Sequence, residues 1–283
     1  MDGAAASGVR PRRLVHGLAG ACHPVPTVVV TTVAVVLAVG IGLPPGRVVG
    51  VGVAVLTGQL SIGWSNDVID ASRDIRAGRA DKPVATGGVP LPVVARAAAL
   101  ALVATVVLSL LLGPRAGAAA LTLVAAGWAY NLGLKGTVAS AATYLIGFAA
   151  LPVVPYLASA EPVWPPWWVP ATGALLGFSA HFANALPDLR ADRETGVHGL
   201  PQRWGARVGV VAMAASLAGA SVVLGFGPAS RSTAFAVTAS TAGIILAAAV
   251  VVAAVRAPHS TLAFRLTLLI AVLDVGLLIG AAG

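Results

Sequence analysis

Apolar runs of roughly the length needed to cross a bilayer recur along the whole chain, separated by short polar or Pro- and Gly-rich breaks. A transmembrane helix needs about 20 such residues. The composition agrees, because 58% of the residues are hydrophobic, 10% are charged and the mean hydropathy is +0.90. We therefore predict an all-α, polytopic membrane bundle of nine transmembrane helices around a central cavity, with spans near residues 25–43, 48–64, 89–112, 116–134, 137–159, 167–187, 207–226, 233–255 and 260–281.

The basic residues orient this bundle, since cytoplasmic loops of membrane proteins carry an excess of Lys and Arg. With the N-terminus in the cytoplasm, thirteen of the 18 Lys and Arg residues fall on the cytoplasmic side and three on the other. The net charge of +8 then reflects topology, and we expect no nucleic-acid partner. We expect a multi-pass protein of the cell membrane, in which a basic, flexible segment at 1–24 precedes a single transmembrane domain at 25–283.

Acidic residues concentrate in two segments on the cytoplasmic side. The stretch "NDVIDASRDIRAGRADKP", residues 66–83, holds four of the ten Asp and Glu residues in the chain, and "LPDLRADRETGVHGLP", residues 186–201, holds three more. Both belong to cytoplasmic loops, at 65–88 and 188–206, which we expect to fold over the mouth of the cavity and exclude water. This concentration of acids in an acid-poor chain predicts a site that faces the cytoplasm.

The spacing of these polar residues predicts two stripes that face each other, because positions four apart share one face of a helix. The first stripe comprises Asn66, Asp67, Asp70 and Asp74, and the second comprises His181, Asn184, Asp188 and Asp192. Facing carboxylates at a membrane boundary are tolerable when cations neutralise them. Oxygen ligands suit magnesium, which binds through a few carboxylates together with substrate phosphates. We therefore expect Mg²⁺ and a diphosphate.

Basic and aromatic residues near these stripes fit an allylic diphosphate. Basic side chains donate to phosphate oxygens, and the candidates are Arg73, Arg76, Arg79, Lys82, Lys135, Arg190 and Arg193. Neutralised diphosphate is a better leaving group, and its departure would leave a carbocation in the apolar interior. Ring faces attract cations, so the candidates to line the cavity are Trp64, Tyr130, Tyr144, Phe148, Phe178 and Phe182.

These motifs resemble those of the UbiA superfamily of intramembrane prenyltransferases. "NDVIDASRD" resembles its first aspartate motif, "DLRAD" resembles the second, and "YNLGLK" resembles an element at the end of its fourth helix. The resemblance implies nine transmembrane helices, magnesium and an isoprenoid diphosphate donor. It also implies catalytic roles for Asp67, Asp70, Asp74, Asp188, Asp192 and Lys135, magnesium ligation by these aspartates and Asn66, and a site role for Tyr130. From these assignments and from the positions of the other polar and aromatic residues near the motifs, we expect substrate binding by Asn66, Arg73, Lys82, Tyr130, Tyr144, His181, Asn184 and Arg193.

The chain departs from the family pattern at two places. Asp81 and Lys82 stand before Pro83 where many members have Asn and Arg, and Gly136 follows Lys135 where a second base is common. These departures predict that contacts to the diphosphate are redistributed in this chain.

Two enzymatic functions stay open at this point. The first is magnesium-dependent transfer of a prenyl group from its diphosphate to a lipophilic, aromatic acceptor. The alternative is a terpene cyclase of the same superfamily, in which the cation is quenched within the donor chain. A cation transporter is disfavoured, because the acids lie at span ends and not near the bilayer midplane. Asp274, deep in the last span, pairs with Arg265 or is functional, and the sequence does not separate these readings.

Overall fold

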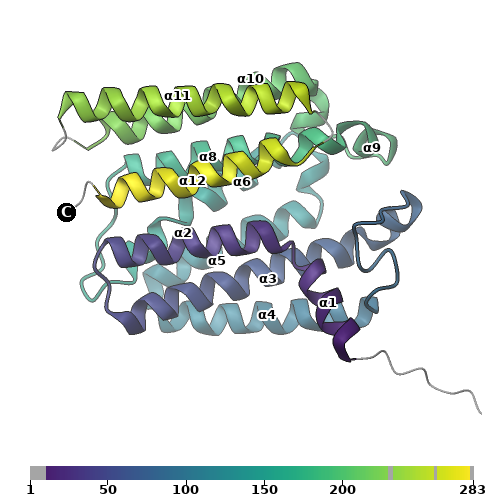
Figure 1. The fold of residues 1–283 in the computed structure, drawn as a ribbon. Coiled ribbons are helices and arrows are strands. Elements are labelled where there is room, and N and C mark those ends of the chain that lie inside the picture. The colour runs from purple at the N-terminus through teal and green to yellow at the C-terminus, as the bar shows by residue number, and fades with distance from the viewer. Residues whose placement is uncertain (1–10, 229–231, 258–259, 281–283) are drawn as a thin grey trace, which may run out of the picture.

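The computed structural model describes residues 11–228, 232–257 and 260–280, and over these ranges the fold is helical, with no β-strand. The long helices lie side by side in one bundle, with α1 inclined to them at one end (Figure 1). The α-helices are α1 (Pro11–Ala21), α2 (Pro24–Gly40), α3 (Pro45–Arg76), α4 (Leu91–Leu111), α5 (Pro114–Asn131), α6 (Ser140–Ala150), α7 (Val153–Leu157), α8 (Trp168–Ala185), α9 (Leu189–Glu194), α10 (Leu200–Phe226), α11 (Thr233–Arg256) and α12 (Leu262–Gly280). Two short 3-10 helices are η1 (Leu134–Gly136) and η2 (Leu186–Asp188).

Prolines begin several of these helices. A proline in the first helical turn loses no hydrogen bond, because the first N–H groups of a helix have no partner within it. The prolines in first turns are Pro24 in α2, Pro45 in α3, Pro92 in α4, Pro114 in α5 and Pro201 in α10. Proline therefore marks where several of the apolar helices begin.

Each predicted span contains a helix, with different bounds at three places. Helix α3 continues past residue 64 to Arg76, α10 begins at Leu200 and not near 207, and the span at 137–159 is divided into α6 and α7. The division falls at Pro152, whose missing N–H and ring interrupt a helix. Among the described residues, five helices are long and apolar enough to cross a bilayer, or six if the bent pair α1–α2 is one span. The chain is a multi-pass membrane protein.

Helix α1 (Pro11–Ala21) lies within the segment 1–24 that the sequence predicts to be flexible. Its Leu14 and Leu18 pack against a buried cluster that includes Ala21 and Val89. The indole Nε1 of Trp64 on α3 also donates to the carbonyl oxygen of Leu18 at 2.9 Å. The basic residues near the N-terminus therefore accompany an amphipathic helix whose apolar face docks on α3, while residues 1–10 lie outside the described ranges.

Two apolar clusters fill the bundle on either side of a cavity. The first draws mainly on α2, α3, α5 and α7, and the second on α8, α10, α11 and α12. The cavity is lined by residues of α2, α3, α5, α6, α8 and α12. It is therefore central to the bundle, as the sequence predicts.

Gly63 is the point at which α3 touches the α1–α2 break, where the chain turns by 67°. A Cβ atom at Gly63 would lie 2.3 Å from the carbonyl oxygen of Cys22, which is backbone and cannot rotate away. We expect Gly63→Ala to lower the free energy of unfolding by about 1–3 kcal/mol, measured by thermal unfolding in detergent. Gly46→Ala is the matched control on α3, since a Cβ there meets open space. Equal melting temperatures for the two variants would contradict this packing.

Candidate active site

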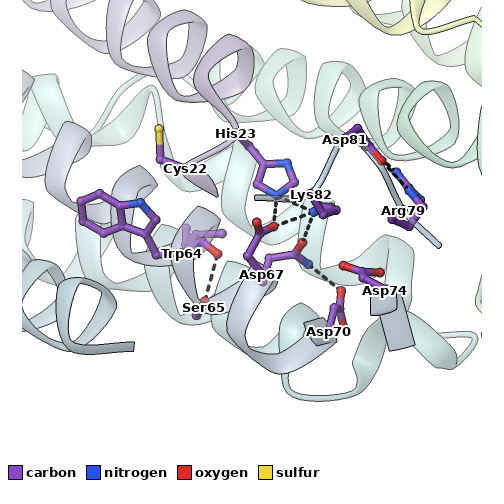
Figure 2. Close-up of polar contacts among 12 residues, drawn as sticks. Cys22, His23, Trp64, Ser65, Asp67, Asp70, Asp74, Arg79, Asp81 and Lys82 are labelled. Carbon is purple, nitrogen blue, oxygen red and sulfur yellow. Dashed lines mark hydrogen bonds and ion pairs between the residues drawn. The ribbon is translucent and has the colours of Figure 1, made fainter. Parts of the chain in front are cut away.

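The first acidic segment forms the last turns of α3. Because α3 continues to Arg76, Asp67, Asp70 and Asp74 follow one another along a helix, as their spacing predicts (Figure 2). All three are buried. An ionised carboxylate that is buried costs several kcal/mol unless it is paired and hydrogen-bonded, so the partners of each acid decide what this segment can do.

Asp67 binds two bases that come from different segments of the chain and meet at the same oxygen (Figure 2). Its Oδ1 accepts from Lys82 Nζ at 2.7 Å and lies 3.1 Å from His23 Nε2. His23 lies at the α1–α2 break. Its backbone is in the left-handed region at φ 55°, which residues other than glycine seldom adopt. Its Nε2 also lies 3.0 Å from Lys82 Nζ. The α1–α2 break and the loop after α3 thus converge on one carboxylate.

Asp70 is held by three side chains. Arg73 Nη2 donates to its Oδ2 at 2.8 Å, Asn66 Nδ2 donates to the same oxygen at 3.1 Å, and Lys135 of η1 pairs with Oδ1. Burial lowers the pKa of Lys135, and the charge of Asp70 opposes that shift. Asn66 also donates to Asn131 Oδ1 at 3.2 Å. The "YNLGLK" segment therefore reaches the first motif through both Asn131 and Lys135.

Arg79 joins the two acidic segments. Its Nη1 donates to Asp188 Oδ2 at 3.1 Å, while Nε and Nη2 donate to the two oxygens of Asp81 at 2.9 Å. The hydrogen bonds from Arg79 lower the pKa of Asp81 to about 2, although partial burial opposes them. The same pairing raises the pKa of Arg79. The loop after α3 is thereby tied to the start of α9.

Asp192 completes the second segment and shares its surroundings with the first. Its Oδ2 accepts from Gln202 Nε2 at 2.8 Å. Burial raises the pKa of Asp192, while the Gln202 hydrogen bond and the charges of Arg73 and Arg79 lower it. Arg73 also pairs with Asp74 at 3.8 Å. The two motifs therefore lie within each other's electrostatic reach, with arginines between them.

The oxygen donors fit magnesium in their chemistry, although the acids are paired with bases. Among the described residues, no three His, Cys, Asp or Glu side chains are gathered closely enough to hold a metal ion. Asp67 Oδ2 is nevertheless buried without a hydrogen-bond partner, and a carboxylate oxygen in that state is open to a cation. Magnesium binds through one or two carboxylates and substrate phosphates and keeps several waters. Such a site does not need a preformed cluster.

An apolar cavity of about 190 Å³ begins beside these charges. Asn66 and Asn184 line its polar end, and Tyr130, Tyr144 and Phe148 line its wall. The rings of Tyr130 and Tyr144 meet edge to face, with 5.3 Å between their centroids. Asn184 Nδ2 donates to the Tyr144 hydroxyl at 3.5 Å. Four predicted site residues, Asn66, Tyr130, Tyr144 and Asn184, therefore meet at this cavity.

Three of the predicted cavity aromatics lie elsewhere. Trp64 packs toward α1, and Phe178 and Phe182 pack on each other at 5.0 Å between centroids. Phe182 also stacks on Trp204 of α10. These rings were predicted from composition near the motifs, which does not tell which face of α8 turns inward. Phe264 of α12 lines the cavity instead.

The predicted stripe from His181 to Asp192 is not one helix. Helix α8 ends at Ala185, and η2 contains Pro187, which interrupts the regular hydrogen bonding of an α-helix. His181 is buried behind Tyr144, 4.8 Å between ring centroids, and its Nε2 lies 3.1 Å from Ser140 Oγ. It is absent from the cavity lining, so nothing here gives it direct access to a substrate.

Arg193 is also engaged away from the cavity. Its Nε donates to the backbone carbonyl of Gln202 at 2.9 Å, and Nη2 donates to the same oxygen. This contact fixes α9 against the start of α10. The predicted role of Arg193 in binding the substrate therefore stays a prediction, and the structure gives this side chain a structural contact.

Sequence reasoning did not select His23, Asn131 or Gln202. Asn131 stands within "YNLGLK" and Gln202 follows the second motif, so both were near a recognised pattern. His23 had one local signal, since it comes directly before Pro24 at the start of the first apolar run. Its 44-residue separation from Asp67 gave no means of pairing the two.

The family comparison agrees with this geometry. The model of the UbiA prenyltransferase family matches residues 27–273. The chain belongs to this family. It is therefore a prenyltransferase, and the match includes both aspartate segments, η1 and the cavity wall. The chain has no match among the curated protein sequences compared with it.

Solved structures of the UbiA fold are similar to this chain over nearly its whole length. A UbiA homolog from Aeropyrum pernix K1, in its apo form, has a TM-score of 0.71 at 17% identity and covers 90% of this chain and 95% of its own. A UbiA homolog from Archaeoglobus fulgidus bound to DMAPP and Mg²⁺ has a TM-score of 0.67 at 14% identity, over 93% and 98%. A digeranylgeranylglyceryl phosphate synthase has a TM-score of 0.67 at 15% identity, over 95% and 98%.

The pairing of Lys82 with Asp67 predicts a large effect on stability. The Lys82 side chain is 12% exposed and that of Asp67 is 1% exposed. Lys82→Met removes the lysine cation from a buried carboxylate and leaves His23 as its basic partner, so we expect a loss of up to about 3–5 kcal/mol in the free energy of unfolding. Denaturant unfolding in detergent measures it. Adding Asp67→Asn to Lys82→Met should recover part of the loss, because no buried charge is then left unpaired.

The control for this prediction is Arg190→Met. Arg190 pairs with Glu194 in solvent, with 90% and 63% of the two side chains exposed, and such a pair contributes little. If Lys82→Met unfolds at the same denaturant concentration as Arg190→Met, the buried pair does not stabilise the fold in the way stated here.

Proposed function

We propose that this protein catalyses magnesium-dependent transfer of a prenyl group from an isoprenoid diphosphate to a lipophilic, aromatic acceptor. The observation that carries the proposal is the position of the charged residues. Acids and bases of α3, the loop after it, η1 and η2 pair with one another, and Asn66, which donates to Asp70, lines the polar end of an apolar cavity with aromatic walls. The diphosphate needs the charged residues, and the prenyl tail needs the apolar cavity.

The bases would bind the diphosphate. Lys135, Arg73 and Lys82 are paired with the acids of the first motif, and each can turn its N–H donors to phosphate oxygens when cations occupy the carboxylates. The residues that would hold magnesium are Asn66, Asp67, Asp70, Asp74, Asp188 and Asp192. When bound, magnesium supplies positive charge that stabilises the leaving diphosphate.

The chemistry divides between the two ends of the cavity. At the polar end, the bond between C1 of the prenyl group and the bridging oxygen breaks, and its electron pair leaves with the diphosphate. The allylic cation stays beside the faces of Tyr130 and Tyr144, which stabilise positive charge. An electron-rich carbon of the acceptor then forms the new bond to C1, and the acceptor loses a proton. Excluding water from the apolar wall prevents hydrolysis of the cation.

The topology belongs to the same proposal. We infer nine transmembrane helices from the apolar runs, and an N-terminus and an active site on the cytoplasmic side from the distribution of Lys and Arg. We place the protein in the cell membrane, where both a prenyl donor and a lipophilic acceptor are dissolved. The segments at 75–88 and 193–206 would cap the site, and the bond between Arg79 and Asp188 supports that arrangement.

Product analysis tests the function. Purified protein in nanodiscs would be incubated with magnesium and geranyl, farnesyl or geranylgeranyl diphosphate, with and without a phenolic or quinol acceptor. Prenylated acceptor supports the proposal, whereas a cyclic hydrocarbon formed without acceptor would identify the terpene cyclase alternative. The absence of diphosphate release from every donor would contradict both.

Substitutions at the acids and at Lys135 should differ in their effects. We expect Asp70→Asn and Asp188→Asn to abolish diphosphate release, because each removes a carboxylate that would bind magnesium. Lys135→Met removes a phosphate contact and should weaken donor binding by about 1.5–3 kcal/mol while leaving some activity. Release of diphosphate is measured at several magnesium concentrations, alongside melting temperature.

Glu194→Gln is the matched control for these variants, since Glu194 is an exposed acid of α9 that pairs with Arg190. We expect it to retain activity. Wild-type activity that persists in excess chelator, or full activity in both Asp→Asn variants, would show that these acids do not bind magnesium.

A further inference from the structure

Phe148 separates two cavities in the bundle. Its ring lines the large cavity beside the charged residues and also a smaller one of about 50 Å³. Val30 of α2 and Leu268 of α12 line both cavities as well. The two spaces are therefore neighbours that meet at three apolar side chains, and Phe148 is the largest of these.

The smaller cavity continues away from the charged end. Its lining includes Val33 and Leu37, which lie one and two turns beyond Val30 on α2, and Leu151 and Val169 from the opposite side. Almost all of its lining residues are apolar. A hydrocarbon is the kind of ligand that such a space accepts.

The position of Phe148 is fixed by backbone contact with α8. A Cβ atom at Gly173 would lie 2.3 Å from the Phe148 carbonyl oxygen, and one at Gly177 would lie 2.5 Å from Phe148 Cβ. Helices α6 and α8 thus approach closely through these glycines. The ring of Phe148 is also stacked on Tyr144, with 6.0 Å between centroids and 6° between planes. These contacts fix the backbone and Cβ of Phe148 at the boundary between the two cavities.

We infer that Phe148 sets the upper limit on the length of the prenyl donor, by closing the large cavity against the smaller one. The inference rests on the proposed function, in which the diphosphate lies at the polar end near Asn66 and the tail runs toward Phe148. A donor whose tail ends at the ring fits the large cavity. A longer donor requires the space beyond it, and removing the ring joins the two cavities.

The test compares donor length in binding and not only in turnover. We would measure the dissociation constants of geranyl and geranylgeranyl thiolodiphosphate, which resist ionisation, with magnesium in nanodiscs. In Phe148→Ala, we expect the preference for the longer analogue over the shorter to rise at least about tenfold. A single methylene group in an apolar pocket already changes discrimination by about that factor. The ratio of kcat/KM for the two diphosphates should shift in the same direction.

Two further variants locate the effect. Phe226→Ala removes an exposed ring of α10 that lines neither cavity, and it should leave the preference unchanged. Val33→Phe fills the smaller cavity from α2, so it should cancel the gain when combined with Phe148→Ala. Phe148→Leu, which retains most of the packing, covers the case in which Phe148→Ala does not fold, and it should give a smaller shift of the same sign.

The outcomes separate this inference from the proposed function. An unchanged length preference in folded Phe148→Ala and Phe148→Leu would overturn the role of Phe148. The proposed function would still stand if the wild-type protein transferred the prenyl group. A gain that Val33→Phe does not cancel would also overturn it, because the longer tail would then lie elsewhere. If the wild-type protein binds neither thiolodiphosphate and releases no diphosphate, both proposals fail.

Discussion

The fold and the site depend on neutralising three buried carboxylates at the end of α3. Asp67, Asp70 and Asp74 would be costly to bury alone, and each has a basic partner. Lys82 reaches Asp67 from the loop after α3, and Lys135 reaches Asp70 from η1. Arg73, on α3 itself, contacts both Asp70 and Asp74. These pairs draw segments that are distant in sequence to the same end of the bundle, and the cavity opens beside them.

The same paired acids and bases would bind a metal and a diphosphate. The bases that neutralise the acids in this structure are the bases that the proposed donor needs, and the acids are the ligands that magnesium needs. Binding of the donor with its cations would therefore exchange one set of ion pairs for another at nearly constant net charge. Asp67 Oδ2 is buried without a hydrogen-bond partner, so a cation could bind it without displacing an existing hydrogen bond.

The sequence predicted the helical spacing of the first motif and the membrane bundle, because both depend on regular local patterns, and the central cavity followed from the size of the bundle and the family resemblance. It also selected Asn66, Tyr130, Tyr144 and Asn184 as site residues, and these four line one cavity. It failed where a contact depends on how distant helices meet. His23 reaches Asp67 through a left-handed turn, and His181 leaves the predicted stripe because η2 with Pro187 interrupts the helix. The docking of α1 was missed because its basic residues obscured its apolar face.

An experimental structure with manganese and inorganic diphosphate tests the central claim most directly. Manganese replaces magnesium at oxygen-rich sites and can be located by its anomalous scattering. We predict manganese bound to carboxylates of both segments, including Asp70 and Asp188, with Arg79 released from Asp188 and Lys135 turned toward the diphosphate. Manganese bound at neither aspartate segment, with the ion pairs of Lys82, Lys135 and Arg79 intact in the presence of diphosphate, would contradict the account.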